Sequence, residues 1–148
     1  MKVLFVCTGN ICRSPTAEAV LRELSKRKGV RLHVESRGTH DYHVGQPPDE
    51  RSMRHAERRG YDLSAQRARQ ISPGDFEAFD LILAMDHGHL RILERICPAQ
   101  HRGKLHLFIE GAEVPDPYYG GADGFERVLD LVEAACRDFL RNMKKATS

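Results

Sequence analysis

The sequence predicts a single-domain α/β protein spanning residues 1–148, with a parallel sheet covered by helices on both faces. Two observations lead to this prediction. A length of 148 residues is typical of one domain and long enough to bury a core. Short apolar runs also alternate along the chain with segments of helical periodicity. This alternation is the pattern of a parallel sheet, because parallel strands need a crossover connection, which is usually a helix.

Four apolar runs are the predicted strands. The run Val3–Val6 is uninterrupted, which is typical of a strand buried on both faces. The other three runs lie at residues 32–36, 81–85 and 105–109. Parallel sheets bind ligands beyond the carboxyl ends of their strands, so we expect a site after the first run, where Cys7 stands.

Helical periodicity marks the segments between these runs. Apolar residues recur three and four positions apart after Pro15, so a first helix is expected to run to about Lys28. Ser14 has the chemistry of its N-cap, and Pro15 suits its first position. Three further helices are predicted at residues 49–59, about 90–97 and 125–143. No linker, repeat or low-complexity tract divides the chain.

Composition argues against several classes of protein. Hydrophobic residues make up 41% and charged residues 30% of the chain, as in ordinary globular domains. The net charge of +2 is too small to favour nucleic acid or a membrane surface as partner. No run approaches the about 20 apolar residues of a membrane span. The first run is too short for a signal peptide, and four cysteines are too few for a disulfide scaffold. We therefore expect a cytoplasmic protein with reduced thiols.

The segment Cys7–Ser14, C-T-G-N-I-C-R-S, has the features of an anion-binding loop. It joins a strand to a helix N-terminus, where backbone N–H groups and the helix dipole favour negative charge. Gly9 permits backbone angles that other residues resist, and Asn10 tolerates the left-handed region. Arg13 adds a planar fork that can hold two phosphate oxygens. The segment lacks G-K-[ST], so it is not a Walker loop.

A cysteine at the base of an anion site is expected to be reactive. A helix N-terminus and a nearby arginine stabilise a thiolate, so Cys7 would be ionised at neutral pH and aimed at a bound phosphorus atom. Ser14 can donate a hydrogen bond to that thiolate. The plainer interpretation makes Cys7 an apolar residue that ends a core strand and Arg13 a surface charge. The strand before the loop, the turn and the helix after it favour the chemical interpretation.

Asp116, within V-P-D-P-Y-Y, is the candidate general acid. An aryl phosphate needs a proton donor for its leaving oxygen, because negative charge builds up there. Pro117 keeps Asp116 away from helical angles, which suits a stiff loop. A turn aspartate is the common meaning of D-P. Together with Cys7 and Arg13, however, a carboxylate favours the catalytic interpretation.

The sequence resembles the low-molecular-weight protein tyrosine phosphatases over nearly its whole length. The resemblance lies in V-C-T-G-N-I-C-R-S-P-T-A-E-A and then, in order, in S-R-G-T (36–39), V-G-Q-P-P-D (44–49), R-A-R-Q (67–70), M-D (85–86) and D-P-Y-Y (116–119). It implies a four-stranded parallel sheet flanked by helices, with the phosphate-binding loop after the first strand. It also implies two-step hydrolysis of phosphotyrosine in proteins through a phosphocysteine, without metal or cofactor. Cys7 would be the nucleophile, Arg13 the phosphate clamp and Asp116 the acid.

Further roles follow from the resemblance. The implied phosphate-binding residues are Thr8, Gly9, Asn10, Ile11, Cys12 and Ser14. Tyr42 is implied as one wall of the site, and the rings of Tyr118 and Tyr119 offer faces for a substrate ring. An aromatic slot with the phosphate site at its bottom favours phosphotyrosine, because phosphoserine would not reach the floor.

The loop is also expected to have supporting residues. By resemblance, Asn10 and Ser36 brace it and Asp86 orients Arg13. One position departs from the family, because Gln66 stands where many members carry a histidine tied to the loop asparagine. An amide can form hydrogen bonds but cannot become charged, so the bracing is expected to differ while the chemistry survives.

Cys12 is the candidate redox partner of Cys7. It is either a packed thiol or a resolving cysteine, which would form a disulfide with oxidised Cys7 and prevent further oxidation. The resemblance supports the second role. Cys97 and Cys136 lie on apolar helix stripes and are expected in the core. The histidine pairs at 40/43 and 87/89 lack further ligands, so no metal site is predicted.

Three other functions stay open. An arsenate reductase of this fold needs further cysteines on a mobile segment, whereas after Met85 the next cysteine is Cys97. By resemblance, a protein arginine phosphatase carries a threonine in place of Ile11 and lacks the second aromatic of D-P-Y-Y. A non-catalytic phosphate-binding module would not need Cys7, Arg13 and Asp116 together.

The expected partners follow from the same analysis. They are tyrosine-phosphorylated proteins, with a bacterial tyrosine kinase of polysaccharide export as one candidate by analogy. Nucleic acid and membrane insertion are not expected. The chain itself is expected to be a monomer or a weak dimer.

Overall fold

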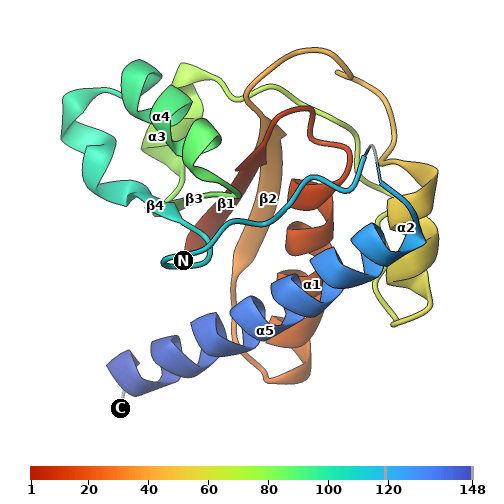
Figure 1. Ribbon diagram of the computed structural model, residues 1–148. Coiled ribbons are helices and arrows are strands. Elements are labelled where there is room, and N and C mark those ends of the chain that lie inside the picture. Colours follow the sequence, from red (N-terminus) through yellow and green to blue (C-terminus); the bar gives the residue numbers. More distant parts are fainter. Residues whose placement is uncertain (119, 148) are drawn as a thin grey trace.

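The computed structural model describes residues 1–118 and 120–147, with the side chains of 144–147 excepted (Figure 1). Within this part of the chain, four parallel strands form one sheet in the order β2-β1-β3-β4. Their bounds are β1 (Lys2–Cys7), β2 (His33–Gly38), β3 (Leu81–Ala84) and β4 (Leu105–Leu107). The predicted α/β class and four-stranded parallel sheet are therefore confirmed.

The strand order places the end of β1 at a switch point. From β1 the chain crosses to β2 on one side, and it later enters β3 on the other side. Cys7 pairs with Gly38 of β2, while β3 pairs with β1 only from Val3 to Val6. Open α/β sheets bind ligands in the crevice at such a point. The fold thus presents Cys7 at the edge where a ligand site is expected.

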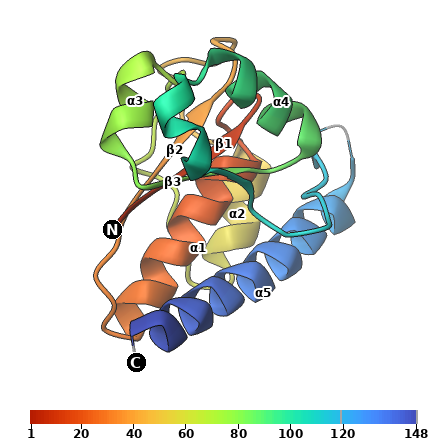
Figure 2. The ribbon, with the colours of Figure 1, turned by 90° about the vertical axis from the view of Figure 1, so that its left-hand side faces the viewer.

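Helices cover both faces of the sheet (Figures 1 and 2). The helices are α1 (Arg13–Arg27), α2 (Glu50–Glu57), α3 (Pro73–Ala78), α4 (His87–Ile96) and α5 (Ala122–Thr147), with a 3₁₀ helix η1 at Ala99–Lys104. Val3 and Phe5 of β1 belong to a core shared with α1 and α5. Leu4 and Val6 belong to a second core shared with α3 and α4. Alternate β1 side chains thus enter opposite cores, as expected for an uninterrupted apolar strand.

Helix α1 corrects one prediction from the sequence. The helix begins at Arg13 with Cys12 as its N-cap residue, so the prediction that Ser14 is the N-cap is wrong. Ser14 lies inside the first turn and is fully buried. Its hydroxyl contacts the thiol of Cys7 instead of capping the helix. The serine that resembled a helix cap in the sequence is therefore a residue of the site around Cys7.

Two further differences concern short elements. β4 ends at Leu107 and is shorter than the predicted run 105–109, because this edge strand pairs with only three residues of β3. Helix α3 was not predicted, although Ser72 and Asp75 form a capping box at its start. Of the helices in the described residues, none combines the length and the apolar composition that a membrane crossing requires.

Candidate active site

The loop from Cys7 to the start of α1 forms a cradle of backbone N–H groups. Asn10 adopts φ = 59°, the left-handed region that an asparagine tolerates, and this turns the chain within the loop. Among the described residues, none accepts a hydrogen bond from the backbone N–H groups of residues 8–12. These donors and the N-terminus of α1 provide positive potential for an anion.

Ser14 places a hydroxyl group on the sulfur of Cys7. The Cys7 Sγ and Ser14 Oγ atoms are 2.9 Å apart. Asn10 Nδ2 donates to the same Ser14 oxygen over 2.9 Å, and an amide nitrogen can only donate. The Ser14 oxygen therefore receives one proton from Asn10. Its own proton can be donated to the Cys7 sulfur over 2.9 Å or to the Arg37 carbonyl over 3.5 Å.

Asn10 also fastens the loop to the neighbouring segments. Its Nδ2 donates to Ser36 Oγ over 2.9 Å, and its Oδ1 accepts from the Arg69 N–H over 3.0 Å. Ser36 in turn donates to the buried carboxyl of Glu18 over 2.8 Å. Burial raises the pKa of Glu18, while the hydrogen bond from Ser36 and the charge of Arg22 oppose that shift. Asn10 and Ser36, the two residues expected to brace the loop, are thus hydrogen-bonded to each other.

Arg13 is buried and lies among three oxygen atoms. Its Nη1 donates to Asp86 Oδ2 over 2.9 Å and to the Val114 carbonyl over 3.1 Å. Its Nη2 lies 3.7 Å from Asp116 Oδ2. Burial opposes the ionisation of Asp86, but the hydrogen bond from the His89 N–H and the nearby Arg13 lower its pKa below the usual value. Asp86, the residue expected to orient Arg13, is thus in direct contact with it.

The loop forms the floor of a cavity of about 320 Å³. Tyr42, His43, Asp116 and Tyr118 also line it and form its rim, with the His43 and Tyr118 ring centroids 6.4 Å apart. The Asp116 side chain is 43% exposed, and its Oδ1 accepts from the Tyr118 N–H over 3.0 Å. Tyr42 is 66% exposed and stacks on His40, with ring centroids 4.9 Å apart. An oxyanion on the floor would therefore have a carboxyl group and aromatic rings above it.

Most of the residues implied by the family resemblance meet at this cavity. The residues on its lining are Cys7, Thr8, Gly9, Ile11, Cys12, Arg13, Tyr42, Asp116 and Tyr118. Asn10 and Ser14 are buried and do not line the cavity, and their side chains are hydrogen-bonded to one another. Tyr119 lies outside the described residues.

Two of the supporting positions have distinct environments. Burial raises the pKa of the Cys12 thiol to about 12, so Cys12 is protonated in the reduced protein. Gln66 donates to the Pro15 carbonyl over 3.0 Å, and no described residue gives its buried Oε1 a hydrogen bond. The Arg69 N–H, not Gln66, satisfies the side-chain oxygen of Asn10. The bracing thus runs through the backbone at this departure from the family pattern.

Three site residues were missed in the sequence. His43 lies over Gly9, where an added Cβ would come within 2.7 Å of its ring, so a larger residue there would displace the His43 side chain. Arg51 donates to the Tyr118 carbonyl over 2.9 Å and lies 5.4 Å from the centre of the Tyr118 ring. His89 Nε2 lies 2.7 Å from Thr8 Oγ1. No sequence motif around these three residues indicates a role in the site, since each reaches the site only through tertiary packing.

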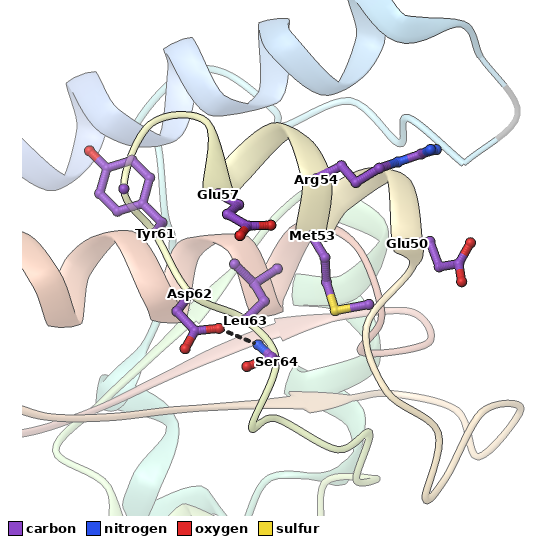
Figure 3. A pocket seen from close by; sticks show the side chains of 9 residues that line it. Glu50, Met53, Arg54, Glu57, Tyr61, Asp62, Leu63 and Ser64 are labelled. Carbon is purple, nitrogen blue, oxygen red and sulfur yellow. Dashed lines mark hydrogen bonds between the residues drawn. The ribbon is translucent and has the colours of Figure 1, made fainter.

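A second hollow, of about 730 Å³, lies between α2 and residues 60–64 (Figure 3). Its labelled residues include Met53, Arg54 and Glu57 on α2 and Leu63 on the segment that follows. On that segment, Asp62 accepts a hydrogen bond from the Ser64 N–H over 2.8 Å. It shares none of its described lining residues with the Cys7 cavity. In the described residues, no group of three or more His, Cys, Asp or Glu side chains could hold a metal ion.

The fold and the loop define an α/β protein with a cysteine-based oxyanion site. Residues 2–148 match the family of low molecular weight phosphotyrosine protein phosphatases. The human phosphatase of that description is 42% identical over 147 residues, which cover 93% of this chain and 92% of the human one. The chain belongs to this family, whose members are hydrolases.

Solved structures agree with that assignment. The crystal structure of a protein tyrosine phosphatase from Entamoeba histolytica matches with a TM-score of 0.94 at 39% identity, covering 100% of this chain and 99% of that one. The arginine phosphatase YwlE of Bacillus subtilis matches with a TM-score of 0.90 at 28% identity, covering 98% of this chain and 97% of that one. The fold thus accommodates more than one phosphoryl substrate.

Proposed function

We propose that this protein hydrolyses phosphotyrosine in proteins through a phosphocysteine on Cys7. The observation that carries the proposal is the convergence of three groups on one cavity. Cys7 lies on its floor beside Ser14, Arg13 lies on the loop, and Asp116 lies on the rim. A nucleophile, an anion clamp and a proton donor are the parts that cleavage of an aryl phosphate ester requires.

The first step transfers the phosphoryl group to sulfur. The loop N–H groups and Arg13 hold the phosphate oxygens, and the Cys7 thiolate attacks the phosphorus opposite the phenolic oxygen. The P–O bond breaks as the S–P bond forms, and Asp116 gives its proton to the departing phenolate. This step requires a protonated Asp116, whose side chain lines the cavity.

The second step releases phosphate. Asp116, now ionised, takes a proton from a water molecule that attacks the phosphocysteine. The S–P bond breaks and the electron pair returns to Cys7, where the Ser14 hydroxyl stabilises the thiolate. Arg13 and the loop N–H groups keep their contacts with the phosphoryl oxygens in both steps, so one preorganised cradle serves both transition states.

The rim supports an aromatic substrate. Tyr42 and Tyr118 lie on the cavity lining around the floor where the phosphate would bind, so the ring of a phosphotyrosine can lie between them. A phosphoserine has no ring to fill this space. Tyrosine-phosphorylated proteins, with a bacterial tyrosine kinase as one candidate, are the proposed partners, and the cytoplasm is the proposed location.

A substrate panel in the presence of a chelator tests the proposal. Phosphotyrosine, phosphoserine and phosphoarginine peptides, and arsenate with a thiol donor, are compared for kcat/KM. We expect phosphotyrosine to be the best substrate and the chelator to leave turnover unchanged. Faster turnover of phosphoarginine would assign the chain to the activity that YwlE is named for. Arsenate reduction, or inhibition by the chelator, would also contradict the proposal.

A further inference from the structure

His89, in the first turn of α4, connects two parts of the site. The residue is only 3% exposed. Its ring Nε2 lies 2.7 Å from the Thr8 hydroxyl, directly after the nucleophile. Its ring Nδ1 lies 3.1 Å from Oδ1 of Asp86, the carboxylate that holds Arg13 through its other oxygen. The proposed chemistry assigns no role to this buried ring.

The surroundings of the ring define its tautomer. Asp86 Oδ1 also accepts from the His89 backbone N–H over 2.9 Å. The Nδ1···Oδ1 pair is not aligned as a hydrogen bond, so its attraction is electrostatic. A bare Nδ1 lone pair facing a carboxylate would be repelled, so the proton resides on Nδ1. Nε2 then has a free lone pair, and the Thr8 hydroxyl donates to it.

The ring stays uncharged at neutral pH. Burial lowers the pKa of His89 to about 4, and the positive charge of Arg13 adds to this shift. Asp86 and Asp116 act in the opposite direction, and His40 contributes a smaller lowering. A neutral imidazole has one donor and one acceptor. The acceptor Nε2 pairs with the Thr8 hydroxyl, while Nδ1 lies 3.1 Å from Asp86 Oδ1 without forming an aligned hydrogen bond.

Thr8 is therefore held from two sides. Its carbonyl accepts from the His40 N–H over 3.1 Å, just beyond the end of β2. Its hydroxyl reaches His89 on α4, which packs on one face of the sheet. The residue that follows Cys7 is thus held both by the segment after the neighbouring strand β2 and by a helix on the face of the sheet, and its backbone N–H belongs to the cradle.

We propose that His89 is a positioning residue that ties the Thr8 end of the phosphate-binding loop to the carboxylate that orients Arg13. One side chain then fixes the positions of both Thr8, next to the nucleophile, and the carboxylate that holds Arg13. The loop and the Arg13 guanidinium therefore keep their relative positions when the phosphoryl group passes to sulfur. The proposal rests on the proposed function only in that the loop binds a phosphoryl group.

The test is a double-mutant cycle read by orthovanadate affinity and by kcat/KM for a phosphotyrosine peptide. His89→Leu and Thr8→Val should each weaken both by about tenfold, the usual cost of one buried hydrogen bond. The double variant should lose no more than the larger single loss, because both substitutions remove the same contact. His89→Gln, whose amide oxygen can accept from Thr8, should recover most of the loss.

A matched control is His87→Leu on the same turn of α4, where the ring is exposed and bonds to Glu113. It should retain the wild-type vanadate affinity. Losses that multiply in the double variant, or equal losses in His89→Gln and His89→Leu, would overturn the proposal. If His89→Leu does not fold, Thr8→Val still removes the Thr8–His89 hydrogen bond, and it does so without a substitution in the core. If the wild type binds vanadate but does not cleave phosphotyrosine, the proposed function fails while the vanadate cycle still decides the role of His89.

Discussion

The floor and the rim of the cavity are built in different ways. The residues Cys7, Asn10 and Arg13 of the loop that forms the floor are at most 5% exposed, and hydrogen bonds fix the last two to distant segments. On the rim, Tyr42 is 66% and Tyr118 36% exposed. This difference means that the phosphate would bind to preorganised groups, whereas the leaving group would contact exposed side chains that can change conformation. Preorganised donors need no reorganisation in the transition state, so we expect the floor to control the rate.

Substitutions on the floor are expected to have the largest effects. Cys7→Ser should abolish turnover, because a hydroxyl is a much weaker nucleophile, yet inorganic phosphate should still bind. Arg13→Ala should lose both turnover and binding, since it removes the charged fork from the cradle. Isothermal titration with phosphate measures the difference, with thermal unfolding as the control for folding. Equal binding of phosphate by Arg13→Ala and the wild type would contradict this assignment.

Asp116 on the rim is expected to matter in proportion to the leaving group. A tyrosine phenolate, with a pKa of about 10, leaves poorly without a proton. Asp116→Asn should therefore slow phosphotyrosine cleavage by about 10²–10⁴-fold, and an activated nitrophenyl ester by less. Single-turnover rates of phosphocysteine formation across a series of aryl phosphates provide the measurement. If the variant depends on leaving-group pKa no more steeply than the wild type, another residue is the acid.

Tyr42 should have a smaller effect that is confined to the substrate ring. Tyr42→Ala should lower kcat/KM for a phosphotyrosine peptide by about two- to tenfold, the worth of one aromatic contact. Inorganic phosphate should bind as before, because the floor is intact. Tyr42→Phe keeps the ring and serves as the matched variant. A loss of phosphate affinity in Tyr42→Ala would show that floor and rim are not separable.

The smallest effect on turnover at neutral pH is expected from the protonation of His89, because the ring is uncharged at that pH. Its protonation affects the stability of the fold instead. The unfolded chain binds a proton on this histidine below about pH 6.5, whereas the folded ring stays neutral down to a pKa of about 4. The unfolded state thus binds more protons in this window, so the free energy of unfolding falls as the pH falls through it, by up to about 3 kcal/mol.

His89→Gln isolates this contribution, because glutamine does not titrate. Urea unfolding at about pH 7 and about pH 4.5 should show a smaller loss of stability in the variant than in the wild type. All other titrating groups are common to both proteins and cancel in the comparison. An equal loss in the two proteins would show that the folded ring titrates as an unfolded histidine does.

Local chemistry explains which parts of the site could be predicted from the sequence. Cys7, Arg13 and the loop turn lie within one strand–loop–helix segment, where chain direction alone brings them together. The left-handed angle at Asn10 follows from the residue type. Asp116 was predicted although a turn aspartate is the common meaning of D-P, because cleavage of an aryl phosphate needs a proton donor and the resemblance places one in D-P-Y-Y. Each of these inferences needed no knowledge of tertiary packing.

The rest depended on packing that no local pattern encodes. Ser14 looked like an N-cap, but its hydroxyl bonds with Cys7 and Asn10, which lie close only once the loop has closed. His89 reaches Thr8 across 81 positions of sequence. Gln66 was known to depart from the family, yet its partner, the Pro15 carbonyl, could not be inferred from an amide's chemistry.

The long reach of the contacts to Arg13 has a consequence for synthesis and folding. Arg13 meets Asp86 at a separation of 73 residues and the Val114 carbonyl at 101. Contacts so distant in sequence form late, because loop closure must come first. A nascent chain that already displays the whole C-T-G-N-I-C-R-S segment therefore lacks a formed clamp until the chain beyond β4 has emerged from the ribosome. Catalytic competence should then appear together with global folding, and a truncated chain that ends before residue 114 should be inert.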